Sequence, residues 1–309
     1  MPADRWIRQC LPMIVLFTDF GLAGPYTGQV KAVLASDAPD IPVIDLFSDA
    51  PTRDPRAAAY LLAAYGAWFP PGTVFVAVVD PGVGGSRKPI VVEADERNYI
   101  GPDNGLFELV IRRAKQCRGW EITWQPPALS ASFHGRDLFA PVAARLARGD
   151  ETTGLARETS PARFADWPDD LAEIIYIGGF GNAMTGLRAG MVPSNASLIA
   201  GHRIIRHGRT YSAVPSHHAF WYENSNGLVE IAVNGGRADA ELALAIGSRV
   251  AVESHRARNA AAIPAAGRNR EKPRPKPHSK PPGTTGNPRL AEQTRKVLGK
   301  HYANKYRVK

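Results

Sequence analysis

An aspartate and an arginine lie seven residues apart in a glycine-rich segment of this 309-residue chain. Asp80 follows an apolar run from 74 to 79 that predicts a buried strand, so its carboxylate is expected at the strand's carboxyl end, where open α/β sheets bind ligands. The residues Pro-Gly-Val-Gly at 81–84 predict a tight turn that returns Arg87 toward Asp80. Taken alone, these residues also fit a common surface turn followed by a solvated cation. The pattern predicts one small site that holds an acid and a base.

The elements that would position this site alternate between strand and helix from 13 to about 147. A second aspartate, Asp19, follows the first apolar run in the same way. This alternation predicts a Rossmann-like α/β layer domain over 13–160. The expected strands are 13–17, 42–46, 74–79, 89–93, 97–100 and 120–124, and the expected helices are 26–36, 55–68, 106–114 and 138–147.

The pattern changes after a polar, proline-containing linker at about 150–170. Short strands at close intervals then predict a small antiparallel β-barrel or sandwich over 171–253. His207-Gly208 is interpreted as a hairpin turn between two of them. The expected strands are 173–177, 203–206, 210–214, 219–223, 229–233 and 248–252.

The positive charge of the chain is concentrated at its carboxyl end. Residues 254–309 contain 15 Lys and Arg against 2 Glu, whereas the whole chain has a formal net charge of +9, so residues 1–253 carry −4. The segment 254–309 is rich in proline and lacks apolar periodicity over most of its length, which predicts a disordered basic tail. Nucleic acid is a possible partner only through this tail, and a solvated extension is the favoured alternative.

Several classes of protein are disfavoured by composition. Only two cysteines occur, Cys10 and Cys117, which excludes a disulfide framework or a cysteine-based zinc site and fits a reducing compartment. No apolar run approaches the length of a transmembrane helix. A soluble cytoplasmic protein is therefore expected. Gly82 to Gly85 also lacks the spacing of a dinucleotide fingerprint and of a Walker-type phosphate loop.

Six short motifs follow one another along the chain. They are Thr18-Asp19-Phe20-Gly21, Asp80-Pro81-Gly82-Val83-Gly84 with Arg87, Pro102-Asp103-Asn104-Gly105, Phe133-His134-Gly135-Arg136-Asp137, Phe180-Gly181-Asn182 and Asn224-Ser225-Asn226-Gly227. In this order and spacing, the chain from about 13 to 253 resembles the S-adenosylmethionine (SAM) hydrolase family, also called SAM hydroxide adenosyltransferases, which are relatives of the fluorinase and chlorinase.

The resemblance implies a fold, an assembly and a reaction. It implies an N-terminal α/β domain, a C-terminal β-barrel, and a homotrimer that binds its substrate between neighbouring subunits. Water would displace methionine from the ribose C5′ of SAM, giving adenosine and L-methionine, with SAM as substrate and neither cofactor nor metal. The catalytic triad of the family falls on Asp80, Arg87 and His134.

This chemistry suits the three residue types. A sulfonium is an excellent leaving group, so the enzyme needs no acid to expel methionine and must instead place and activate a water molecule. Arg87 would fix the Asp80 carboxylate by paired hydrogen bonds. His134 is the better base candidate because the unperturbed pKa of histidine, about 6.5, lies near working pH. Whether Asp80 or His134 takes the proton is left open at this point.

The resemblance also implies substrate-binding residues. Asp19 suits the two ribose hydroxyls, because one carboxylate can accept both hydrogen bonds, although a helix-capping role is the alternative. Phe20 belongs to the same motif. Asn182 can donate and accept toward an adenine edge, or it is a turn residue. Ser225 corresponds to the part of the site that holds the methionine end.

The chain departs from the family pattern at four positions. Gly178 takes the place of an aspartate that would be the natural partner of the methionine ammonium group. Gly24, Ser48 and Gly186 replace a usual Asp, His and Asn. These departures motivate a second hypothesis, a SAM- or adenosine-binding protein without turnover. A SAM-dependent halogenase is less favoured, because a short turn joins the strands at 93 and 97, and the Asp80 charge would repel a halide.

Overall fold

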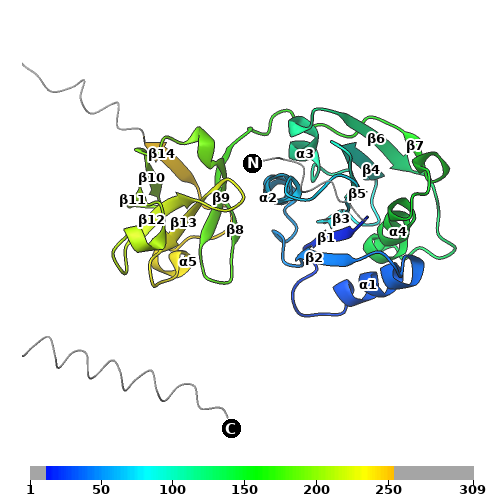
Figure 1. Ribbon diagram of the computed structural model, residues 1–309, viewed down its shortest axis with the longest axis horizontal. Helices are drawn as coiled ribbons and strands as arrows, with labels where there is room; N and C mark the ends of the chain where they lie inside the picture. Colours follow the sequence, from blue (N-terminus) through cyan, green and yellow to red (C-terminus); the bar gives the residue numbers. More distant parts are fainter. Residues whose placement is uncertain (1–11, 254–309) are drawn as a thin grey trace, which may run out of the picture. The chain divides into compact units, whose positions relative to one another are not determined.

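The computed structural model describes residues 12–253, which form two domains built on β-sheets (Figure 1). Within these residues the first sheet has seven strands in the order β2-β1-β3-β5-β4-β6-β7. The strands β2, β1, β3 and β5 are parallel, and β4, β6 and β7 extend the sheet in antiparallel fashion. The strands are β1 (Ile14–Thr18), β2 (Val43–Phe47), β3 (Val74–Val78), β4 (Pro89–Ala94), β5 (Arg97–Pro102), β6 (Cys117–Ile122) and β7 (Ala156–Glu158).

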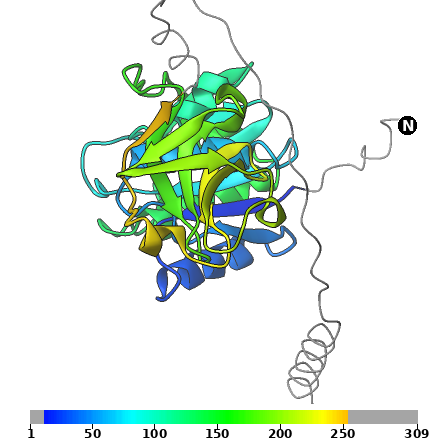
Figure 2. The same cartoon turned by 90° about the vertical axis from the view of Figure 1, so that its left-hand side faces the viewer.

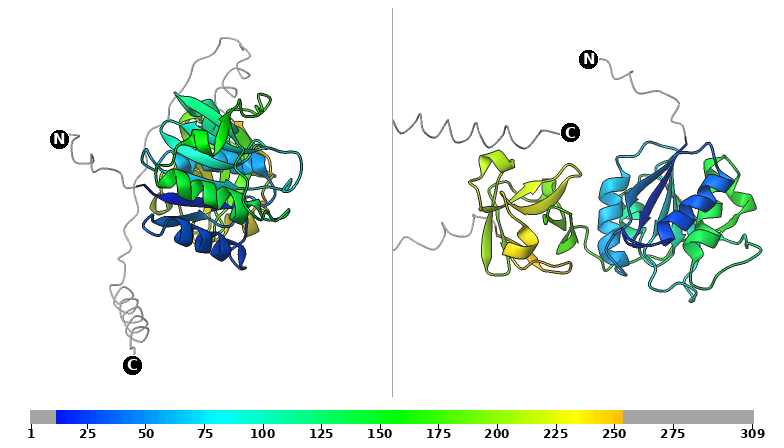
Figure 3. Two further views of the ribbon diagram at one scale, coloured as in Figure 1. Left: turned by 90° about the vertical axis from the view of Figure 1, so that its right-hand side faces the viewer. Right: turned by 90° about the horizontal axis from the view of Figure 1, so that it is seen from below.

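Helices cover both faces of this sheet, as Figure 3 shows in its right-hand view. Successive residues of β1 alternate between two cores: Val15 and Phe17 belong to the core that includes α2 (Pro55–Gly66), and Ile14 and Leu16 to the core that includes α1 (Tyr26–Asp37). The helix α3 (Glu108–Arg113) contacts α2, and α4 (Ala140–Ala147) contacts α1. Because both faces are buried, every residue of β1 and of β3 is buried, as expected for central parallel strands. The prediction that helices and a sheet form layers in the first domain is therefore confirmed.

The second sheet is nearly a barrel (Figure 2). Its strand order within the described residues is β14-β10-β11-β12-β13-β9-β8, and a bridge between Glu173 and Arg249 brings the two outer strands together. Its core surrounds Trp221. The strands are β8 (Leu171–Ile177), β9 (Ala183–Arg188), β10 (Ser197–Ala200), β11 (Arg203–His207), β12 (Ala219–Glu223), β13 (Leu228–Val233) and β14 (Val250–Glu253), with the short helix α5 (Ala238–Glu241).

Three details of the second sheet differ from the prediction. The expected strand at 210–214 is wrong, because Tyr211–Ala213 form a turn of 3₁₀ helix. The expected hairpin at His207-Gly208 is also wrong, since β11 and β12 pair in parallel. Gly208 serves close packing instead: a Cβ there would lie 2.6 Å from Val214 Cγ2. The strands β9 and β10 were not predicted at all.

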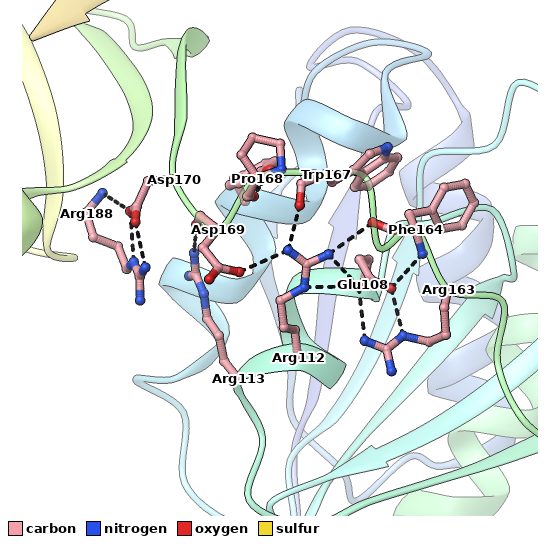
Figure 4. Close-up of polar contacts among 11 residues, drawn as sticks. Glu108, Arg112, Arg113, Arg163, Phe164, Trp167, Pro168, Asp169, Asp170 and Arg188 are labelled. Carbon is pink, nitrogen blue, oxygen red and sulfur yellow. Dashed lines mark hydrogen bonds and ion pairs between the residues drawn. The ribbon is translucent and has the colours of Figure 1, made fainter.

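The segment between the two sheets is tied to the first domain by a buried glutamate (Figure 4). Glu108 of α3 has a fully buried side chain. Its carboxylate accepts hydrogen bonds from Arg163 Nε at 2.9 Å, Phe164 N at 3.1 Å and Arg112 Nη2 at 2.7 Å. Burial would raise the pKa of Glu108, but these donors outweigh it and lower the pKa to about 2. The linker is thus held by a charged network.

The basic segment 254–309 lies outside the described residues. Between residues 12 and 253, none of the helices is both long enough and apolar enough to cross a membrane.

Candidate functional site

Asp80 and Arg87 form a buried ion pair just beyond the carboxyl end of β3. Arg87 Nε donates to Asp80 Oδ2 at 3.0 Å and to Oδ1 at 3.2 Å, and Nη2 donates to Oδ2 at 2.5 Å. The side chain of Asp80 is only 4% exposed and that of Arg87 only 9%. The chain returns through two turns, closed by hydrogen bonds from Val83 N to Asp80 O and from Gly85 N to Gly82 O. The sequence-predicted approach of Arg87 to Asp80 is present.

His134 completes this group through the same guanidinium. Arg87 Nη2 lies 2.8 Å from His134 Nδ1. A guanidinium can only donate hydrogen bonds, so Nδ1 must accept, and the neutral imidazole therefore carries its proton on Nε2. Burial lowers the pKa of His134, and the positive charge of Arg87 lowers it further. His134 is accordingly neutral near pH 7, and its Nε2–H is a donor for which residues 12–253 provide no acceptor.

Close packing of glycine holds the two loops of this group together. Gly84 has a φ of +76°, and a Cβ there would lie 2.5 Å from Ala131 O, so the turn after Asp80 packs directly on the segment before His134. That segment is held in turn by Asp137, which accepts from Ser130 N at 3.0 Å. The end of β3 is fixed by Asn104, whose side chain donates to Val79 O at 2.9 Å. The triad is therefore supported by Asn104 of the motif at 102–105 and by Asp137 of the motif that contains His134.

Asp19 lies at the same edge of the first sheet, because β1 and β3 are parallel neighbours and Thr18 pairs with Val78. Its Oδ2 accepts from Arg53 N at 2.9 Å. Burial raises the pKa of Asp19, the backbone N–H of Arg53 opposes that rise, and the negative charge of Asp80 adds to it. The two carboxylates are therefore close enough to influence each other.

Phe20 belongs to an aromatic cluster beside this edge. Its ring centroid lies 5.7 Å from that of Phe133 and 6.1 Å from that of Tyr26. A Cβ on Gly135 would lie 2.9 Å from Phe20 Cζ, so Phe20 packs on the loop that carries His134. The structure brings together five of the predicted residues: Asp19, Phe20, Asp80, Arg87 and His134.

The other two predicted residues, Asn182 and Ser225, line a cavity of about 690 Å³ that is formed mainly by the second domain, with Tyr65 of α2 also in its lining. Asn182 Nδ2 donates to Tyr211 OH at 2.6 Å and lies 3.4 Å from Tyr222 OH. The volume falls within the range of small-molecule sites. The lining does not include the five residues at the edge of the first sheet. It consists of Tyr65, Phe180, Asn182, Met184, Tyr211, Tyr222, Asn224, Ser225, Glu230, Val233, Gly235 and Gly236.

Sequence reasoning missed one charged residue of this cavity, Glu230. It lies in β13, all six residues of which are buried, and it is itself only 4% exposed. The signal was a single charge inside the otherwise apolar run Leu-Val-Glu-Ile-Ala-Val. Such a residue is rarely buried without a specific partner.

The departures at Gly186 and Gly178 have different structural settings. A Cβ at Gly186 would lie 2.6 Å from Leu171 Cβ and 3.0 Å from Leu171 O, so this sheet admits no larger side chain there. At Gly178 the nearest atom to such a Cβ is 3.9 Å away, on Tyr176. The missing carboxylate at 178 is therefore not explained by packing.

The described residues do not contain a group of three or more His, Cys, Asp or Glu able to hold a metal ion. What the edge of the first sheet offers is a fixed carboxylate, a guanidinium that holds it, and a neutral imidazole with a free N–H donor. This set can orient a water molecule and accept its proton.

Comparison with known proteins adds an independent line of evidence. The family model "SAM hydroxide adenosyltransferase N-terminal domain" matches residues 14–156, and that of the C-terminal domain matches 172–251. The chain is similar to the (R)-S-adenosyl-L-methionine hydrolases of Thermus thermophilus (38% identity, 77% of this chain, 98% of the relative) and Salinispora arenicola (36%, 78% and 97%). Fluorinases are more distant, that of Nocardia brasiliensis being 23% identical over 45% of this chain and 55% of its own.

A solved structure agrees with these matches. The crystal structure of an uncharacterized conserved protein from Thermotoga maritima superimposes with a TM-score of 0.72 at 29% identity, covering 78% of this chain and all of the other. Both domains are thus matched in sequence by the two family models, and the chain belongs to the SAM hydroxide adenosyltransferase family.

Proposed function

We propose that this protein hydrolyses S-adenosyl-L-methionine to adenosine and L-methionine by attack of water on the ribose C5′. The family assignment supports this reaction, and so do the curated hydrolases that match over nearly their whole length. The observation that carries the proposal is the contact of one guanidinium with both Asp80 and His134. The three residues were predicted from distant parts of the sequence, and they meet in one place.

The hydrogen bonds favour a division of roles within the triad. His134 Nδ1 accepts from Arg87 and its Nε2 already carries a proton, so the imidazole can donate to a water or hydroxide oxygen but has no free lone pair. Asp80 Oδ2 accepts from both Nε and Nη2 of Arg87, whereas Oδ1 accepts only from Nε and keeps an unused lone pair. We therefore assign proton acceptance to Asp80, the holding of the attacking oxygen to His134, and the orientation of both side chains to Arg87.

The remaining site residues would bind the rest of the substrate. Asp19, beside Asp80, is assigned to the ribose hydroxyls, and Phe20 to the apolar wall of that part of the site. Asn182 is assigned to the adenine edge and Ser225 to the methionine end. Since these two line a cavity whose residues do not include the triad, we propose that neighbouring subunits of a homotrimer complete each site.

Further expectations accompany this function. We propose that the first domain is Rossmann-like, with helices on both faces of parallel strands, that no cofactor takes part, and that the enzyme is cytoplasmic. The ratio of two cysteines to 309 residues is consistent with a reducing compartment. If the protein binds nucleic acid, we propose that it does so only through the basic segment 254–309.

The test is incubation of the purified protein with SAM and separation of the products by chromatography. We expect adenosine and methionine from the natural protein and not from His134→Ala. A protein that binds SAM or adenosine without forming products supports the alternative of a non-catalytic binder. Parallel reactions with added fluoride or chloride distinguish a halogenase, which would form a 5′-halo nucleoside in proportion to the halide.

A further inference from the structure

The cavity lined by Asn182 and Ser225 contains a buried carboxylate, that of Glu230, which has no Lys or Arg partner within residues 12–253. Glu230 Oε1 accepts from Tyr222 OH at 2.7 Å, and Oε2 accepts from Asn224 Nδ2 at 2.9 Å. Both donors are neutral. Among residues 12–253, neither the lining of the cavity nor any ion pair places a Lys or Arg beside this carboxylate.

Such a carboxylate is costly unless a positive charge reaches it. Two neutral hydrogen bonds satisfy part of its acceptor capacity, but they do not replace the hydration that an anion loses on burial. Its position is well defined, because Glu230 pairs across the sheet with Tyr222 on one side and Met184 on the other. The charge therefore faces the cavity from a rigid central strand.

Aromatic rings surround the same space. Tyr65, Phe180, Tyr211 and Tyr222 line the cavity, and Phe180 is 86% exposed. Aromatic faces attract cations, and a carboxylate among them strengthens that preference. The carboxylate also influences a neighbouring tyrosine: burial raises the pKa of Tyr65, and the negative charge of Glu230 raises it further. The cavity is thus suited to a ligand group with a positive charge.

We infer that Glu230 binds the α-ammonium group of the substrate's amino acid part and serves the role for which Gly178 has no side chain. This inference rests on the proposed function, since it assumes an aminoacyl sulfonium as substrate. It agrees with the assignment of Ser225 to the methionine end, because Asn224, the neighbour of Ser225, is bound to Glu230 Oε2. Glu230 is therefore a specificity residue for the amino group.

The test compares ligands that differ only in this amino group. L-Methionine and its deaminated analogue, 4-(methylthio)butanoate, are titrated into the full chain in the presence of adenosine by calorimetry. The variants are Glu230→Gln, which keeps the shape and removes the charge, and Glu223→Gln, a matched control at an exposed glutamate that does not line this cavity.

We expect Glu230→Gln to weaken binding of L-methionine by about 30-fold or more, the loss found when one partner of a buried charge pair is removed. Binding of the deaminated analogue should stay within threefold of the natural protein, and Glu223→Gln should alter neither ligand. Equal losses for both ligands would overturn the inference, because they would indicate a structural role. Equal binding of both ligands to the natural protein would overturn it as well.

These outcomes are separate from the fate of the proposed function. If SAM yields no adenosine, hydrolysis is wrong, whereas the calorimetric comparison needs no turnover and still decides whether Glu230 recognises an ammonium group. Where hydrolysis is observed, Glu230→Gln should raise KM for SAM by the same factor and change kcat much less. A fall in kcat at unchanged KM would contradict the assignment.

Discussion

Replacement of Arg87 by lysine separates the charge of this residue from its geometry. The guanidinium contacts both Asp80 oxygens and, through Nη2, also His134 Nδ1. Lysine keeps the positive charge, so the buried carboxylate remains compensated, but a single ammonium group lacks the planar fork that serves two partners at fixed angles. The triad should therefore lose its arrangement while the fold survives.

The size of the effect follows from the hydrogen bonds that are lost. A hydrogen bond to a charged group contributes about 1.5–3 kcal/mol, and Arg87→Lys loses at least one such bond to Asp80 together with the bond to His134. A loss of about 3 kcal/mol in the transition state corresponds to roughly 100-fold in kcat. KM for SAM should change little, because Arg87 is assigned to orienting Asp80 and His134 and not to binding the substrate.

The assay is steady-state formation of adenosine from SAM, with the melting temperature as a measure of folding. A matched control is Arg188→Lys in the second domain, where Nε and Nη2 donate to Asp170 at 2.8 and 2.6 Å in a similar fork. The control should keep kcat within twofold. If Arg87→Lys also keeps kcat within threefold, the guanidinium does not organise the reacting groups and the proposed division of roles is refuted.

Three more predictions concern pH, backbone and linker. Since the pKa of His134 is lowered, kcat/KM should stay level as pH falls to 6.5 and decline only below that pH. The stability that neutral His134 contributes should likewise be lost as pH falls below 6.5. A decline in kcat/KM centred above pH 6.5 would contradict this prediction. Gly84→Ala should reduce kcat and should lower the free energy of unfolding by more than Gly72→Ala does. Gly72 shares the positive φ but has open space around it, so Gly72→Ala should cost only about 1–2 kcal/mol. Equal losses of stability in the two variants would refute the close packing of Gly84 on Ala131. Glu108→Gln should lower the free energy of unfolding by about 3 kcal/mol in denaturant titrations. The natural protein should lose a similar stability as pH falls from 4.5 toward 2. An unchanged free energy of unfolding in Glu108→Gln would show that the linker network is dispensable.

Much of the first domain could be predicted because its apolar patterns are long and its helices have clear limits. The run at 13–17 and the run at 74–79 both became buried central strands, and their parallel pairing explains why Asp19 and Asp80 share one edge. The helix predicted from Pro55 begins there, with Asp54 accepting from Ala57 N as its cap. Local sequence was sufficient where burial on both faces left few alternatives.

The second domain was less predictable for equally physical reasons. The strand β9 contains Gly186 and Met184 and few β-branched residues, so its strand propensity is weak, and pairing with β8 and β13 decides its conformation. The parallel pairing of β11 with β12 depends on a connection that no local pattern specifies. Position 208 required glycine for a close approach that only the folded sheet reveals.

The candidate site was likewise predictable in part. Motif order located Asp80, Arg87 and His134, but the tautomer of His134 depends on a contact 47 residues apart in sequence, which no spacing could reveal. Glu230 was overlooked because it lies in no recognisable motif, and only its burial beside a cavity marks it. Sequence indicated which groups could react, whereas the structure was needed to propose which of them donates and which accepts.

Reaction in water enriched with ¹⁸O tests the central claim most directly. Attack of water on the ribose C5′ predicts that mass spectrometry finds one labelled oxygen in adenosine, on its 5′-hydroxyl, and none in methionine. Unlabelled adenosine, or label in homoserine formed alongside methylthioadenosine, would mean that water attacks elsewhere and would contradict the mechanism assigned to Asp80, Arg87 and His134.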